Sequence, residues 1–209
     1  YSATQSNGFD ELKKQIMWFA VSIVIMIIMM IVDYDVWAKL SPIFYGISII
    51  LLIAVLFTKA RNGASSWFNI GAFSLQPAEL AKVAVVLFTA STIAKVQEKG
   101  KAEINVFWKL CITIATVIFP VFLIILQPDY GTAAAYIISL VVMLFVSGID
   151  RKYIIIALIM VIIALPLAYF FVLPDHAKTR IDIFLNPESD PKGAGYNVLQ
   201  SKIAIGSGE

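Results

Sequence analysis

Charged residues are scarce in this chain of 209 residues: they make up 14% of it, whereas 60% is hydrophobic and the mean hydropathy is +0.86. Soluble domains average roughly 25% charged and 45–50% apolar residues. The composition is therefore that of an integral membrane protein. The net charge is only +2 and no run of Lys and Arg occurs, so no nucleic acid or other acidic polymer is expected as a partner.

Cysteine and histidine are scarcer still. Cys111 is the only cysteine, so it cannot form an intrachain disulfide, and its apolar surroundings predict an inert buried thiol. With His176 as the only histidine, a multi-histidine metal site is excluded. The chain starts at Tyr1 without the positively charged segment and short apolar core of a signal peptide, so no signal peptide is predicted. Both ends look internal, and we expect a fragment of a larger membrane protein.

What the chain has in abundance is long apolar runs. They predict an all-α, polytopic membrane protein with six transmembrane helices in this chain. Five of the predicted spans are 16–32, 40–58, 77–94, 110–128 and 153–174, and another follows the turn at 128–131 and ends near Ile149. The predicted organisation is a helical bundle over residues 1–174 and a polar tail over 175–209. Within that tail, Asn197–Ile205 is expected to form a short amphipathic helix at the membrane interface.

The distribution of basic residues predicts the orientation in the membrane. Six spans place both ends of the chain on one side. Seven Lys and Arg residues lie in 25 positions of the loops on the opposite side, at 33–39, 95–109 and 150–152. Only four lie in 37 positions on the side of the termini, at 1–15, 59–76 and 128–131. Because cytoplasmic loops carry the excess of basic residues, the first set is predicted to face the cytoplasm.

The most informative stretch is Ala64–Lys82, which begins as a loop and runs through Gln76 and Pro77 into the third span. Proline suits the first position of a helix, where its missing N–H removes no hydrogen bond. Glu79 lies in the first turn, where the helix dipole favours a negative charge, and Lys82 follows on the same helix face. A charged pair at the head of a membrane helix indicates a functional site. The alternative is an interfacial pair that reaches to the lipid headgroups.

Two further ionisable residues are predicted at the same outer level. Asp129 precedes Gly131 at the start of the fifth span, where a turn or N-cap role is the alternative to function. Lys14 flanks the first span, where an ordinary membrane anchor is favoured over a site role. In the tail, Asp190 lies in a turn rich in Pro and Gly and is expected to be structural.

Three separated motifs, WFNIG…QPAELAK, QPDYGTA and NPESDPKGAGYNVLQSKIAIGSG, resemble the SEDS family of cell-wall proteins, which includes RodA and FtsW. Their order and the intervening spans fit as well, the resemblance covers essentially the whole chain, and the third motif is more similar to RodA. The residues that support the motifs are Trp67, Gln76, Pro77, Gln127, Pro128, Gly131, Pro187, Asp190, Gly195, Tyr196, Gln200 and Ser201.

The resemblance implies a function. Such proteins polymerise lipid II into the glycan strands of peptidoglycan, with undecaprenyl diphosphate leaving, beside a class B penicillin-binding protein in the bacterial cytoplasmic membrane. The six spans would be helices two to seven of about ten, and 175–209 the start of a large extracellular loop. The family's essential aspartate lies further along that loop, in a Thr-Asp-Phe segment that this sequence does not contain. The chain alone is therefore expected to be inactive.

The reaction itself sets requirements on the site. An acceptor hydroxyl attacks an anomeric carbon while a diphosphate leaves, which needs a carboxylate as base and positive charge for the leaving group. Because the lipid stays in the bilayer, the site belongs at the outer interface, where Glu79, Lys82, Asp129 and Lys14 are predicted to line a polar cavity. Basic residues of the tail are candidates for further phosphate contacts, namely Arg180, Lys192 and Lys202. No cofactor is predicted, and participation of a divalent cation stays open.

Two other functions remain as alternatives. A transporter for the lipid-linked precursor would need polar residues deep within several spans. The spans 16–32 and 110–126 contain no ionisable group except Cys111, which disfavours transport. A non-catalytic scaffold that binds the membrane anchor of a penicillin-binding protein is left open by the sequence.

The orientation can be tested with introduced cysteines. Because 95–109 is predicted to be cytoplasmic, a cysteine at Gly100 should be protected from an impermeant thiol reagent in intact cells. A cysteine at Asn62 should be labelled. The reverse pattern would invert the predicted topology.

Overall fold

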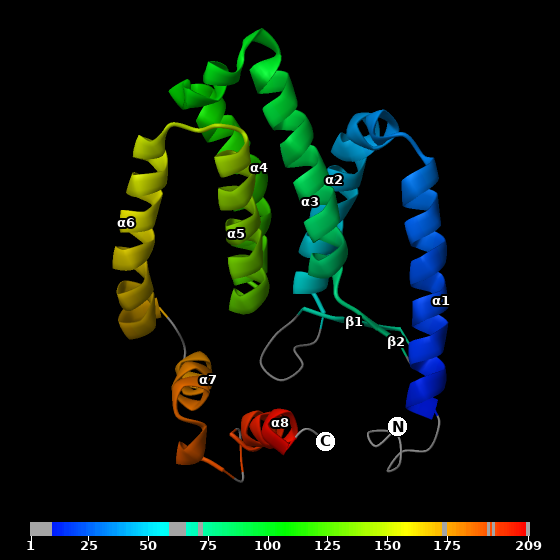
Figure 1. Cartoon of the computed structure of the whole chain (residues 1–209), viewed down its shortest axis with the longest axis vertical. Coiled ribbons are helices and arrows are strands. Elements are labelled where there is room, and N and C mark those ends of the chain that lie inside the picture. The colour runs from blue at the N-terminus through cyan, green and yellow to red at the C-terminus, as the bar shows by residue number, and fades with distance from the viewer. Residues whose placement is uncertain are drawn as a thin grey trace. The chain divides into compact units, whose positions relative to one another are not determined.

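The computed structural model describes residues 10–58, 66–70, 73–172, 175–191, 193 and 195–207 (Figure 1). The chain divides into two compact units, Tyr1–Ile149 and Asp150–Glu209. The first unit contains α1 (Asp10–Ile31), α2 (Tyr34–Leu56), β1 (Phe68–Ile70), β2 (Phe73–Leu75), α3 (Pro77–Val96), η2 (Gln97–Lys99), η3 (Lys101–Asn105), α4 (Phe107–Ile125) and α5 (Tyr130–Val146). The second contains α6 (Arg151–Leu167), the π-helical η4 (Ala168–Val172), α7 (Asp175–Leu185), η5 (Pro187–Ser189) and α8 (Tyr196–Ser207).

Long apolar helices confirm the predicted all-α membrane fold. Among the residues that the structure describes, three helices are long and apolar enough to cross a bilayer, namely Leu12–Ile31, Tyr34–Leu56 and Phe107–Ile125. The other predicted spans are helical as well. α3 has 20 residues but carries charged side chains at both ends, α5 has 17 residues, and α6 is extended by η4.

The structure differs from the sequence prediction mainly in the segments between and after the spans. The polar connection predicted at 33–39 is already helical from Tyr34, because the Asp33 side chain accepts a hydrogen bond from the Asp35 amide and caps α2. The segment predicted as a loop before α3 contains an antiparallel hairpin in which Phe68 pairs with Leu75. The tail contains α7 besides the helix predicted at 197–205, which is present as α8. The position of α8 at the membrane interface stays a prediction.

Small and polar side chains let the helices of the first unit pack closely. Ala78 and Ala81 of α3 are completely buried, and such residues allow helix backbones to approach in a membrane. Further along, the buried hydroxyls of Thr89 on α3 and Thr116 on α4 are 2.8 Å apart and share a hydrogen bond. Beyond the C-terminal end of α3, Glu103 of η3 forms an ion pair with Lys109 of α4 at 2.5 Å. The hydrogen bond and charge of Lys109 lower the pKa of the Glu103 carboxyl.

A tight turn joins α7 to α8 within the second unit. The Asp190 carboxylate accepts from the Gly193 amide at 3.0 Å, and the Asp190 carbonyl accepts from the Gly195 amide at 3.1 Å. A Cβ on Gly195 would lie 2.3 Å from the Pro187 carbonyl oxygen and 2.7 Å from that of Asp190. Only glycine fits there, because both neighbours are backbone atoms. The turn gives Asp190 the structural role expected from the sequence.

Replacing Gly195 should therefore loosen the tail. In Gly195→Ala the backbone must shift, at a cost of about 1–3 kcal/mol, as for other overpacked sites. Gly206→Ala is the matched control, because a Cβ at Gly206 meets nothing within 4 Å. Trypsin should cleave the tail of the detergent-solubilised Gly195 variant faster than that of the control. Equal cleavage rates would show that the turn tolerates a side chain.

Candidate functional site

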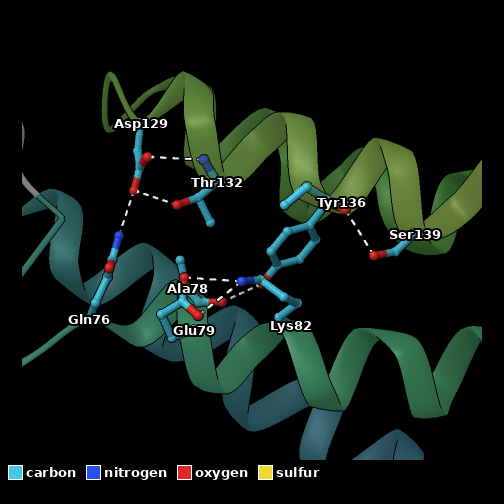
Figure 2. A network of polar contacts seen from close by, with 9 residues as sticks. Gln76, Ala78, Glu79, Lys82, Asp129, Thr132, Tyr136 and Ser139 are labelled. Atoms are coloured by element: carbon cyan, nitrogen blue, oxygen red, sulfur yellow. Dashed lines mark hydrogen bonds and ion pairs between the residues drawn. The ribbon is translucent and has the colours of Figure 1, made fainter. Parts of the chain in front are cut away.

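The N-terminal ends of α3 and α5 lie at the same end of the first unit and carry most of the polar residues singled out by the sequence (Figures 1 and 2). α3 begins at Pro77, as predicted, with Gln76 as its N-cap. The Gln76 side chain makes no capping hydrogen bond to α3. Its amide is therefore available to reach another part of the chain.

Glu79 and Lys82 form the predicted pair on one face of α3. The Lys82 ammonium is 3.0 and 2.9 Å from the two oxygens of the Glu79 carboxylate. The Lys82 side chain is 29% exposed and that of Glu79 is 56% exposed. This exposure matters for energetics, because an accessible pair contributes far less to stability than a buried one.

Asp129 binds three donors at the start of α5. Its Oδ1 accepts from the Thr132 amide at 3.2 Å, which makes it the N-cap predicted as one alternative. Its Oδ2 accepts from the Thr132 hydroxyl at 2.9 Å and from Gln76 Nε2 at 2.6 Å. The bond to Gln76 joins the N-terminal ends of α3 and α5 (Figure 2).

The turn before α5, at residues 127–129, also binds the residue that precedes the β-hairpin. The hydroxyl of Ser66, which precedes β1, donates to the Gln127 carbonyl at 3.2 Å. Gln76, which follows β2, is bonded to Asp129. The hairpin is thus tied at both of its ends to residues 127–129. Two motifs that were recognised separately in the sequence are one structural unit, and Trp67, 39% exposed, lies at its first end.

Gln127 is part of the core rather than of an open site. Its side chain is fully buried, and its Nε2 donates to the Leu52 carbonyl of α2 at 3.1 Å. Its Oε1 has no hydrogen-bond partner among the described residues. The QPD turn is therefore fastened to α2 as well as to the hairpin.

Tyr136 is the site neighbour that sequence reasoning missed. It is 2% exposed, and its hydroxyl donates to the Ala78 carbonyl in the first turn of α3 at 2.6 Å (Figure 2). Its spacing from Asp129 and Thr132 was the available signal, because residues seven and four apart share one face of a helix.

Several predicted residues are not placed with this group. Lys14 is exposed on α1, and its proximity to Glu79 stays a prediction. Lys202 is exposed on α8 of the second unit, while Lys192 and the Arg180 side chain lie outside the described residues. Of the residues supporting the third motif, Pro187 and Gly195 are buried in the turn, and Tyr196, Gln200 and Ser201 are exposed on α8. In the described part of the chain, no three His, Cys, Asp or Glu side chains group as metal ligands would.

Comparison with known proteins identifies relatives of the whole chain. A family model of FtsW, RodA and SpoVE, described as cell cycle proteins, matches residues 1–209. Peptidoglycan glycosyltransferase MrdB of Escherichia coli K12 is 35% identical over 213 residues, which cover 99% of this chain and 55% of the relative. A probable peptidoglycan glycosyltransferase FtsW of Geobacter metallireducens is 34% identical, over 97% of this chain and 53% of the relative. The chain thus spans about half the length of these curated relatives.

Solved structures give the same result. One solved structure is described as showing the coordination of polymerization and crosslinking by a peptidoglycan synthase complex. It matches with a TM-score of 0.74 and 29% identity, over 93% of this chain and 56% of that one. The rod shape determining protein RodA of Thermus thermophilus matches with a TM-score of 0.61 and 25% identity over 73% of this chain and 50% of that one.

The geometry separates two contributions of Asp129 that can be measured. Asp129→Ser keeps an oxygen for capping α5 but is too short to reach Gln76, whereas Asp129→Ala loses the cap as well as the bond to Gln76. The serine variant should lose about 1 kcal/mol, the value of one hydrogen bond, and alanine about 1 kcal/mol more. Asp33→Ser is the control, because Asp33 caps α2 within its own segment.

Thermal unfolding of the detergent-solubilised protein checks this ordering. For a chain of this length, about 1 kcal/mol corresponds to a shift in Tm of about 2–4 °C. If Asp129→Ser unfolds at the temperature of Asp33→Ser, the bond between Gln76 and Asp129 contributes no stability.

Proposed function

Since the chain belongs to the family of FtsW, RodA and SpoVE cell cycle proteins, we propose that the protein polymerises peptidoglycan glycan strands from lipid II. Undecaprenyl diphosphate leaves in this reaction, at the outer face of the bacterial cytoplasmic membrane. The names of two relatives as peptidoglycan glycosyltransferases support the reaction class. The observation in this chain that carries the proposal is the group of polar residues held together at the N-terminal ends of α3 and α5.

Lys82 is the residue we assign to the leaving diphosphate. The diphosphate gains negative charge as the sugar–phosphate bond breaks, and a fixed positive charge stabilises that change. The ammonium belongs to a residue in the second turn of α3, near the helix end whose dipole also favours anions. Both oxygens of Glu79 bind the ammonium, which holds it on this face of α3 until a substrate phosphate competes for it.

The proton acceptor for the attacking hydroxyl is assigned to no residue of this chain. The Asp129 carboxylate already links Gln76 to the cap of α5, and the Glu79 carboxylate is paired with Lys82, so we assign neither as the base. Asp129 acts instead as the brace between α3 and α5. From the resemblance to the SEDS family, we propose that the base lies in the segment with Thr-Asp-Phe.

A class B penicillin-binding protein is the partner we propose. Support comes from the solved relative, which is described as a peptidoglycan synthase complex that coordinates polymerization and crosslinking. In this arrangement the membrane bundle binds the lipid-linked substrate, and the partner crosslinks the glycan strand that is made.

Glu79 and Lys82 are the residues on which the proposal is tested, in the full-length protein. Because Glu79 is 56% exposed, losing the pair should cost no more than about 1 kcal/mol, rather than the 3–5 kcal/mol typical of a broken buried pair. Glu79→Ala and Lys82→Ala should therefore insert and fold normally. Lipid II polymerisation should nevertheless fall at least about ten-fold in each, since about 1.4 kcal/mol of transition-state stabilisation is a factor of ten.

The charge-swapped variant, with Glu79→Lys and Lys82→Glu together, separates binding from structure. A purely structural pair tolerates the exchange, whereas a lysine that meets a diphosphate does not. The Lys99→Ala variant is a matched control, because Lys99 is exposed in η2 at the other end of α3. Normal polymerisation by both single alanine variants would remove the pair from the site.

A further inference from the structure

Two hydrogen bonds connect α3 with α5 at different depths. The first joins Gln76 to Asp129 where the helices begin, and the second joins Tyr136 to the Ala78 carbonyl further along α5. We propose that Tyr136 is a positioning residue for the Glu79–Lys82 pair, whose hydroxyl fixes the first turn of α3 against α5. This inference rests on the proposed function for its link to polymerisation, but its structural part can be tested without it.

Burial makes the Tyr136 bond a strong constraint. Tyr136 is 2% exposed, and Ala78, whose carbonyl it binds, is completely buried. A buried phenol needs a hydrogen-bond partner, because leaving its O–H unpaired away from water is costly. The carbonyl of residue 78 is therefore held to the Tyr136 hydroxyl even though it also faces the amide of residue 82 within the helix.

The position of this carbonyl links Tyr136 to the charged pair. In an α-helix the carbonyl of residue 78 binds the amide of residue 82, so Tyr136 contacts the acceptor that anchors the backbone of Lys82. Ala78 is also the residue before Glu79. In addition, the Lys82 side chain and Tyr136 line one small cavity together with Ser139 and aliphatic residues. A shift at Tyr136 is thus transmitted to both members of the pair.

The two hydrogen bonds between α3 and α5 constrain α3 more than either bond does alone. On its own, the bond between Gln76 and Asp129 fixes the residue before α3 against α5 but not the first turn of α3. The second bond, seven residues further along α5, fixes the first turn of α3 as well. It thereby sets the position of Glu79 and Lys82 relative to α5. Because a displacement of about 1 Å can lower a reaction rate about 100-fold, fixing the position of Glu79 and Lys82 affects catalysis more than binding.

The test compares Tyr136→Phe with Thr89→Val in the full-length protein with its partner. Each variant removes one buried hydrogen bond of α3 and keeps the side-chain volume close to the original. Thr116 keeps its bond to the Thr113 carbonyl in the control, so neither variant leaves a buried hydroxyl without a partner. Only the Tyr136 bond lies next to Glu79 and Lys82.

Two measurements decide the outcome. At saturating lipid II, Tyr136→Phe should lower kcat about ten-fold with KM within about two-fold of the original, while Thr89→Val leaves both unchanged. Amide exchange in 77–83 and 128–133 should become about five-fold faster in Tyr136→Phe, as expected when one hydrogen bond is lost from local opening. In the control, faster exchange should be confined to the middle of α3.

Each contrary result has its own meaning. Unchanged exchange at 77–83 in Tyr136→Phe, or the same loss of kcat in both variants, would overturn the positioning role. If the original protein does not polymerise lipid II at all, the proposed function fails, while the exchange measurement still decides whether Tyr136 fixes α3 against α5.

Discussion

The hydrogen bond from Gln76 to Asp129 is the constraint on which the rest of the site depends. At 2.6 Å it joins the residue before α3 to the residue before α5, and one of its partners is a carboxylate, which strengthens it. It makes the end of the β-hairpin, the start of α3 and the start of α5 a single unit. Asp129 can serve this purpose because its other oxygen caps α5 at the same time.

Main-chain carbonyls are the preferred acceptors for the side chains that link elements of the first unit. Ser66 donates to Gln127, Gln127 to Leu52, and Tyr136 to Ala78, while Gln97 donates to the Ser147 carbonyl at 2.7 Å near the other end of the bundle. A carbonyl oxygen has two lone pairs, so it can accept such a donor beside its helical partner. Such bonds fasten backbone rather than side chains, which makes the helix positions themselves well defined.

The exposure of Glu79 changes how the charged pair should be understood. If the pair were buried in hydrocarbon, each charge would offset the cost of burying the other. Removing one partner would then unfold the protein. Glu79 is more than half exposed and Lys82 nearly a third exposed on the surface of this chain, so no packed protein interior encloses the pair. Its chemistry, a held ammonium at the positive end of a helix, is the better explanation, and this is why the alanine variants are informative about function.

The sequence alone determined the class of protein, the helical nature of all six spans and the local geometry at their ends. Pro77 begins α3, Glu79 and Lys82 meet across one helical turn, and Asp129 caps α5, because these depend on residues only a few positions apart. The hairpin escaped prediction, since its short strands lie among residues that suit a loop equally well.

Only the tertiary structure decided which distant residues meet. Gln76 finds Asp129 across 53 positions, Tyr136 finds Ala78 across 58, and Ser66 finds Gln127 across 61. In a soluble helix the apolar stripe would indicate the packed face. In a membrane, lipid-facing and protein-facing side chains are equally apolar, so hydropathy does not show which face of α3 packs against α5. That choice is made by the fit of small residues such as Ala78 and Ala81 against a neighbouring helix, which exists only once the helices are assembled.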